Sequence, residues 1–342
     1  CHPAIVKCLE ERAHTILHCS NYFYNEPAVQ TAKLIVENSC FDKVLFANSG
    51  AEANEGQIKL ARKYAKDHGH PERFVVITMK ESFHGRTLAT CTATGQYPVH
   101  RYFEPLPDGF RYAEFNNLDS VKAIMDEYVC AILTEPVQGE GGVRPASREF
   151  LQGLRELCDE KGILLMFDEV QVGSGRTGKL FAHQYYGVEP DTCSMAKALG
   201  SGVPIAAVCA KGEAAKVLTP GTHGSTFAGG PLACALAATT LDVMLNEGVL
   251  DNCAEMGEYF RQQAHEVIEK HHPNAIQEIR GLGLIDGIQL KHPSGQPVVD
   301  LCFQDSKVLI NNTAGNVLRF IPPLIVGKEE IDIVIKAVDD AM

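Results

Sequence analysis

A single lysine, Lys197, stands in the otherwise apolar stretch Met195-Ala-Lys-Ala-Leu199. A buried ammonium group needs a charged partner or a lowered pKa, because burial disfavours the charged form. The neutral amine is the nucleophilic form, and lysines that bond covalently to carbonyl groups lie in such surroundings. The alternative is an ordinary loop lysine that reaches solvent. This stretch by itself does not decide between the two.

Two adjacent acids, Asp168 and Glu169, follow the apolar run Ile163-Leu-Leu-Met-Phe167. A run without alternation is typical of a strand buried on both faces, so the two side chains should leave the sheet on opposite faces. A carboxylate there could hold the proton of a cofactor ring nitrogen and so make the ring an electron sink. A helix cap or a magnesium ligand would explain the pair equally well.

A third stretch, Asn48-Ser-Gly-Ala-Glu-Ala-Asn54, follows another predicted strand. Ser49 and Glu52 have the spacing of a capping box, which predicts that a helix begins here. Gly50 and Ala51 leave the first amides of that helix uncovered, and such amides bind phosphate. The alternative is a well-capped helix with no ligand.

These stretches need a scaffold in which strands alternate with helices. Strands are predicted at 43–46, 74–79, 129–133, 163–167, 205–209 and 317–321, and helices at 52–67, 118–127, 148–161, 231–246 and 251–271. The alternation predicts an α/β fold with a mainly parallel sheet, which binds ligands at the carboxyl ends of its strands. We expect a remnant of an N-terminal segment at 1–18, a large domain at 19–248 and a smaller C-terminal α+β domain at 249–342.

Composition excludes several classes of protein. The net charge of -12 argues against nucleic acid as a partner, and no apolar run approaches the length of a membrane span. The 12 scattered cysteines contain no C-x-x-C pair, which favours free thiols in the cytoplasm over disulfides or a zinc site. We predict no metal site, since His68, His70, His271 and His272 stand among polar residues. The glycines of 281–287 predict a tight turn, not a dinucleotide loop.

Six blocks taken together resemble the class III aminotransferases, and the resemblance covers essentially the whole chain. The blocks are Ser49-Gly-Ala-Glu-Ala-Asn54, Ser82-Phe-His-Gly-Arg-Thr87, Glu135-Pro-Val-Gln-Gly-Glu-Gly-Gly142, Asp168-Glu-Val-Gln171, Met195-Ala-Lys-Ala-Leu199 and Gly224-Ser-Thr-Phe227. The resemblance implies the fold type I architecture of pyridoxal 5'-phosphate (PLP) enzymes.

The resemblance also implies which residues bind the cofactor. Lys197 would bond to it covalently and carry the reaction proton, and Asp168 would pair with the ring nitrogen. The remaining cofactor contacts would come from Gly50 and Ala51 at the phosphate, Phe83 and Val170 on the two ring faces, Gln171 near the phenolic oxygen, and Thr226 at the phosphate of the neighbouring subunit.

Four further residues would bind substrate. Arg86 resembles the arginine that holds a substrate carboxylate, and Ser225 would lie near the substrate. Glu140 and Arg319 match a pair that works as a switch: the closed pair masks Arg319, and the open pair lets Arg319 bind the α-carboxylate of 2-oxoglutarate. A surface charge on a strand is the alternative for Arg319.

The expected reaction is transfer of the δ-amino group of N2-acetyl-L-ornithine to 2-oxoglutarate by a cytoplasmic homodimer with shared active sites. Ornithine, succinylornithine and 4-aminobutyrate are alternative donors, and a non-catalytic homologue is a remote alternative. The chain opens at Cys1-His2-Pro3, whereas the family has a preceding segment that supplies part of the substrate pocket and of the dimer surface.

Overall fold

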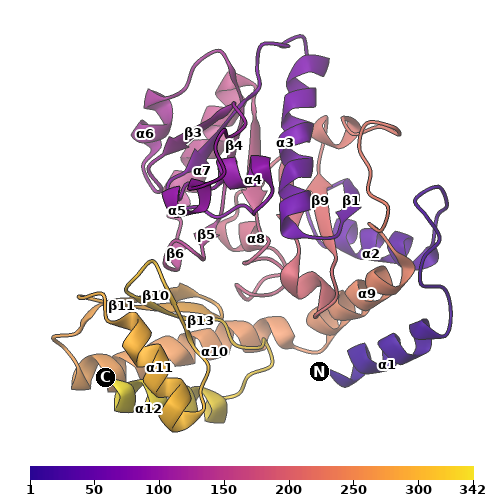
Figure 1. Cartoon of the computed structure of the whole chain (residues 1–342). Helices are drawn as coiled ribbons and strands as arrows, with labels where there is room; N and C mark the ends of the chain where they lie inside the picture. The colour runs from indigo at the N-terminus through magenta and orange to yellow at the C-terminus, as the bar shows by residue number, and fades with distance from the viewer.

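The computed structural model describes all residues, 1–342, and its larger part is a seven-stranded sheet between helices (Figure 1). The strand order is β1-β9-β8-β7-β4-β2-β3. The strands are β1 (Lys43–Ala47), β2 (Val75–Met79), β3 (Phe110–Ala113), β4 (Val129–Thr134), β7 (Leu164–Asp168), β8 (Thr192–Met195) and β9 (Ala206–Ala210). Neighbours from β8 to β3 pair in parallel, and only β9 runs antiparallel to both of its neighbours. The predicted α/β class with a mainly parallel sheet is confirmed.

Helices cover both faces of this sheet. Leu165 and Phe167 share an apolar cluster with Phe150 and Leu154 of α7. Leu164 and Met166, which alternate with them along β7, share a second apolar cluster with Leu60 of α3. The helices of this part are α1 (Pro3–Ala13), α2 (Glu26–Glu37), α3 (Gly50–Asp67), α4 (Leu88–Ala93), α5 (Tyr97–His100), α6 (Leu118–Ala123), α7 (Arg148–Lys161), α8 (Ala182–Tyr186) and α9 (Pro231–Asn246). The apolar run of β7 therefore has the two-sided burial that its sequence predicts.

A four-stranded antiparallel sheet, in the order β10-β11-β13-β12, forms the smaller part. Its elements are α10 (Val249–Gln263), a π-helical turn (Ala264–Glu269), β10 (Ile276–Leu282), β11 (Ile285–Leu290), α11 (Gly295–Ser306), β12 (Asn311–Thr313), β13 (Val317–Phe320) and α12 (Lys328–Ala341). The buried members of its apolar cluster all lie between Cys253 and Val338. We propose that the domain boundary lies at Gly248, between α9 and α10, and that α1, which packs on α9, belongs to the front segment.

Several sequence expectations need correction. Strands β3 and β8 were not predicted, because neither has a long apolar run. The helix expected at 118–127 ends at Ala123. Beyond that residue, Arg111 donates to the carbonyl of Ile124, and Asp126 accepts a hydrogen bond from the amide of Tyr128, so these groups do not bond within a helix. The turn expected within 281–287 is confirmed as the β10–β11 hairpin.

Two findings bear on other expectations. No single helix has the length and hydropathy of a membrane span; α9 and the helix from Val249 to Glu269 meet both criteria only as a pair bent by 67°. All 12 cysteines are unpaired, and eight of them are buried.

Candidate active site

A cavity of about 510 Å³ opens at the carboxyl ends of β1, β4, β7 and β8. It collects nine of the twelve predicted site residues: Gly50, Ala51, Phe83, Arg86, Glu140, Asp168, Val170, Gln171 and Lys197. Ser225, Thr226 and Arg319 do not line it. The parallel strands bring these loops to one edge, as open α/β sheets do.

Asp168 ends β7 on the face that α3 covers, and its carboxylate is held on both oxygens. Oδ2 accepts hydrogen bonds from Asn54 Nδ2 at 2.7 Å and from His84 Nδ1 at 2.8 Å. Oδ1 accepts from the Val170 amide at 3.0 Å and from Ser194 Oγ at 3.3 Å. These four hydrogen bonds fix the orientation of the buried carboxylate at the edge of the cavity.

Lys197 follows β8, the strand next to β7, and its backbone has a left-handed φ of 44°. A non-glycine residue rarely adopts this conformation, and such strain is concentrated at functional sites. The side chain is open to solvent through the cavity, yet protein atoms surround it closely enough that desolvation lowers the pKa of its amine. Asp168, Glu140 and Glu135 oppose this shift without cancelling it. The position therefore favours a nucleophilic amine beside a carboxylate.

The beginning of α3 offers free amides to the same cavity. Ser49 caps the helix by accepting from the amide of Glu52, while the amides of Gly50 and Ala51 donate to no group of the chain. Glu52 departs from the expected capping box, because its carboxylate reaches back to Asn48 and not to Ser49. A Cβ on Gly50 would come within 2.6 Å of Val170 Cγ1, so only glycine lets the helix start this close to Val170.

Glu140 and Arg319 form an ion pair that joins the two domains. Arg319 Nη1 lies 2.7 Å from Glu140 Oε1, and Gln171 Nε2 donates to the same oxygen at 3.2 Å. Burial would raise the pKa of Glu140, but the hydrogen bond and charge of Arg319 outweigh it, so this pKa lies below its usual range. Arg319 Nε also donates to Asn311 on β12 at 2.9 Å. The alternative of a surface charge is wrong, since Arg319 is buried.

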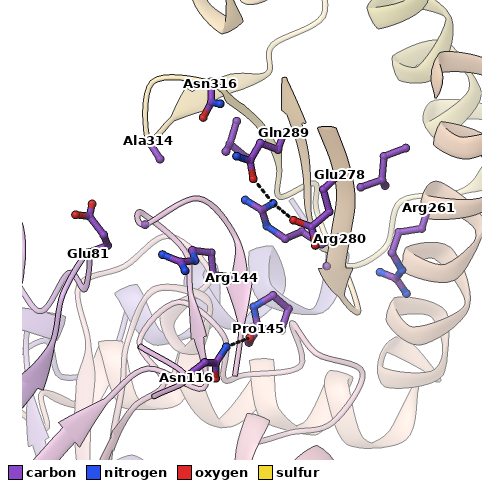
Figure 2. A pocket seen from close by; sticks show the side chains of 14 residues that line it. Glu81, Asn116, Arg144, Pro145, Arg261, Glu278, Arg280, Gln289, Ala314 and Asn316 are labelled. Carbon is purple, nitrogen blue, oxygen red and sulfur yellow. Dashed lines mark hydrogen bonds and ion pairs between the residues drawn. The ribbon is translucent and has the colours of Figure 1, made fainter. Parts of the chain in front are cut away.

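The smaller domain holds the loop that carries Glu140. This contact lies beside a second cavity, of about 880 Å³ (Figure 2). Arg280 of β10 donates to the carbonyls of Gly142 and Val143. The third guanidinium nitrogen, Nη1, donates to the side chains of Glu278 and Gln289, as the dashed lines in Figure 2 show. This cavity contains no lysine and no buried carboxylate, so the chemistry belongs to the smaller cavity.

Three of the predicted substrate and phosphate contacts lie at the edge of the site. The guanidinium of Arg86 is exposed and lies 5.3 Å from the centre of the Phe83 ring, with no carboxylate partner. Ser225 receives a hydrogen bond from Asn48, a cavity residue, at 2.9 Å. Thr226 is exposed and makes no contact with the cavity of its own chain.

Sequence reasoning gave no role to three buried cavity residues, Asn54, His84 and Glu135. Asn54 and His84 hold Asp168, and the Nε2 atom of His84 is buried without a partner. Glu135 follows β4 and accepts from the Phe83 amide at 3.0 Å. Burial raises the pKa of Glu135 well above its usual value, and the charge of Asp168 adds to this. The signal that could have identified Glu135 was its place after an apolar strand, the same place that singled out Asp168.

The cavity fits a phosphorylated aromatic aldehyde. The free amides of α3 suit a phosphate, Phe83 and Val170 supply apolar surfaces, and Asp168 and Lys197 supply a buried carboxylate and an amine. Together with the fold, these groups define the class of PLP-dependent enzymes. No three His, Cys, Asp or Glu side chains within 1–342 are grouped as metal ligands would be.

Comparison with known proteins identifies the family. The sequence pattern of the aminotransferase class-III family matches residues 1–342, and the chain belongs to this PLP-dependent family. An acetylornithine aminotransferase from Caldanaerobacter subterraneus is 46% identical over 342 residues, which cover 100% of this chain and 86% of that protein. Another from Methanocaldococcus jannaschii is 47% identical over 340 residues, 99% of this chain and 84% of the relative.

Solved structures agree on the fold. The ornithine aminotransferase from Toxoplasma gondii superimposes with a TM-score of 0.94 at 34% identity, covering 100% of this chain and 82% of the other. The N-acetylornithine aminotransferase from Stenotrophomonas maltophilia gives a TM-score of 0.85 at 36% identity, and the match covers 99% of this chain and 85% of that one. The expected fold type I architecture is confirmed.

Proposed function

We propose that the chain transfers the δ-amino group of N2-acetyl-L-ornithine to 2-oxoglutarate, giving N-acetyl-L-glutamate 5-semialdehyde and L-glutamate. The amine of Lys197 and the carboxylate of Asp168, brought to one cavity by neighbouring strands β8 and β7, are the observation that carries the amino-transfer chemistry. The choice of donor draws on relatives named acetylornithine aminotransferases at 46% and 47% identity. This reaction belongs to arginine biosynthesis.

Bound PLP supplies an electron-poor ring that stabilises negative charge on the substrate carbon bearing the amine. Asp168 would hold the proton on the ring nitrogen, which keeps the ring electron-poor, while Asn54 and His84 fix the carboxylate. Gly50 and Ala51 would bind the phosphate through their amides. Lys197 would hold the cofactor covalently, and its amine, when free, would move a proton at the substrate carbon that bears the amine.

The Glu140–Arg319 pair supports a reaction in two halves with different substrates. While the pair is closed, Arg319 has no free edge for the α-carboxylate of an amino acid, so the distal amine of the donor is the group that reacts. When Glu140 turns away, Arg319 would bind the α-carboxylate of 2-oxoglutarate, with Arg86 available for the second carboxylate. Gln171, held over Gly139, would approach the phenolic oxygen of the cofactor.

A homodimer with shared active sites is part of this proposal. Thr226 is exposed, with no contact to its own cavity, and would bind the phosphate in the partner subunit, while Ser225 stays near the substrate. The unpaired cysteines support a cytoplasmic location, because thiols stay reduced there. The net charge of -12 supports small-molecule substrates and no nucleic-acid or membrane partner.

The test is a comparison of kcat/KM for N2-acetylornithine, ornithine, succinylornithine and 4-aminobutyrate, each with 2-oxoglutarate and added PLP. We expect ping-pong kinetics and the highest kcat/KM for N2-acetylornithine. Ornithine is the second candidate, since the ornithine aminotransferase from Toxoplasma gondii superimposes with a TM-score of 0.94. A preference for another amine would refute N2-acetylornithine as the donor but not amino transfer as the reaction. The absence of turnover with all four amines would refute amino transfer.

A further inference from the structure

Behind the sheet, on the side of β7 away from Asp168, a cysteine, a histidine and a glutamate contact one another in series. Cys40 Sγ lies 3.6 Å from His183 Nε2, and His183 Nδ1 lies 2.9 Å from Glu169 Oε1. The three residues come from the loop before β1, from α8 and from the end of β7. None of them lines the cavity of the active site.

The orientation of the imidazole is fixed by its surroundings. Glu169 is buried, and its carboxylate also accepts from the backbone amides of Ala182 and His183. Because this carboxylate only accepts hydrogen bonds when ionised, His183 Nδ1 carries the proton toward it, and Nε2 faces the sulfur. The rings of Phe41 and Phe181, with centroids 5.4 Å and 5.1 Å from that of His183, hold the imidazole in place.

Such an arrangement activates a thiol. An imidazole that is held by a carboxylate can take the proton of the neighbouring sulfur, and the thiolate is the reactive form of cysteine. Burial would lower the pKa of His183, but hydrogen bonds with Cys40 and Glu169 and the charge of Glu169 outweigh it and raise the pKa to about 9. An imidazolium is thus stable beside the sulfur at neutral pH.

We propose that Cys40, His183 and Glu169 form an activated-thiol site at which Cys40 reacts with small-molecule disulfides. The Cys40 thiolate attacks one sulfur of the disulfide, a new S–S bond forms to Cys40, and the original S–S bond breaks. The leaving thiolate takes up the proton that passed from Cys40 to His183, so that one thiol and one disulfide give one mixed disulfide and one thiol.

Cys40 is half-buried, not fully buried, and the chain offers a matched comparison. Eight cysteines are buried, whereas Cys8, Cys19 and Cys40 are half-buried. The sulfur of Cys19 hydrogen-bonds to the carbonyl of Ser20, at 3.8 Å, and makes no hydrogen bond with an imidazole. Cys19 therefore reports the reactivity of an ordinary half-buried thiol in the same molecule.

The experiment measures modification rates of Cys40 and Cys19 in the PLP-loaded enzyme by peptide mapping, with iodoacetamide and with glutathione disulfide. At pH 6.5 we expect Cys40 to react about five to ten times faster than Cys19, because His183 lies where it can take the proton of the Cys40 thiol. H183Q should reduce the Cys40 rate to that of Cys19. H265Q, in an exposed histidine paired with Glu269, should leave it unchanged.

A second measurement keeps the test decisive if H183Q does not fold. In the wild-type enzyme, the ratio of the iodoacetamide rate at Cys40 to that at Cys19 should be largest at low pH and fall as the pH rises, because only Cys40 has an imidazole to take its proton. Equal rates at the two cysteines, an unchanged Cys40 rate in H183Q, or a Cys40 rate that rises only with that of Cys19 would each overturn the proposal. Fast labelling with iodoacetamide but no mixed disulfide would overturn the disulfide chemistry.

Discussion

Asp168 and Glu169 are adjacent carboxylates at the end of one strand, and each contacts the Nδ1 atom of a histidine. Asp168 faces α3 and lines the cavity, where its carboxylate accepts four hydrogen bonds. Glu169 faces α8 and is enclosed by backbone amides and His183. The comparison teaches that the same contact between an acid and a histidine lines a cavity on one face of the strand and is enclosed against a helix on the other, depending on what each face opens to.

The K197A variant tests the cavity that Asp168 and Lys197 line, and it should have the largest effect. We expect a loss of at least about 10⁴-fold in kcat, because this substitution removes both the covalent attachment and the proton carrier. Steady-state kinetics with N2-acetylornithine measure the loss. K179A, in an exposed lysine outside the cavity, serves as control and should retain wild-type kcat. Retained turnover in K197A would contradict the assignment.

The next largest effect should separate the two carboxylates directly. D168N is expected to lower kcat by about 10³-fold, since an amide cannot stabilise the ring proton as a carboxylate does. D119N, at an exposed helix position, should have no effect. If D168N keeps a kcat near that of the wild type, Asp168 only shapes the cavity.

E169Q should show the opposite pattern, with stability lost and chemistry kept. Breaking a buried ion pair from one side costs about 3 kcal/mol of unfolding free energy, because His183 loses its partner. Urea unfolding measures this value, and kcat of the folded enzyme should stay within about twofold of wild type. E156Q, in an exposed glutamate of α7, is the matched control. An E169Q variant that is stable but inactive would reverse the comparison.

The pKa of His183 predicts how stability depends on pH. Because Cys40 and Glu169 raise this pKa to about 9, His183 stabilises the fold fully below its unfolded pKa, and the contribution is lost as pH rises through 9. Between pH 7 and 9 the wild type should lose about 2 kcal/mol more unfolding free energy than H183Q. Parallel pH profiles for the two proteins would show that the histidine does not titrate in this range.

The smallest expected effect concerns the pair between the domains. E140Q frees Arg319 to bind an α-carboxylate from the start, so the ratio of kcat/KM for glutamate to kcat/KM for N2-acetylornithine as donors should rise by about tenfold. E127Q, in an exposed glutamate without an ion pair, should leave the ratio unchanged. An unchanged ratio in E140Q would mean that Glu140 does not mask Arg319.

Much of the site could be predicted because local patterns mark strand ends and helix starts. Asp168, Gly50 and Ala51 each follow such a pattern. Lys197 was predicted from its apolar surroundings together with the family resemblance, although strand β8 before it was missed because Cys193 and Ser194 interrupt the apolar pattern. His84 and Glu135 received no role, since their importance comes from contacts with Asp168 and Phe83, which lie 84 and 52 residues away.

The sequence by itself determined that Asp168 and Glu169 leave the sheet on opposite faces, because side chains of a strand alternate. It also determined where α3 begins, through the cap at Ser49. Only the tertiary structure decided which face opens into a cavity and which is closed by α8. The same holds for Arg319 and Glu140, 179 residues apart, and for Cys40 and His183, 143 apart, because contacts between distant segments depend on how sheets and helices pack.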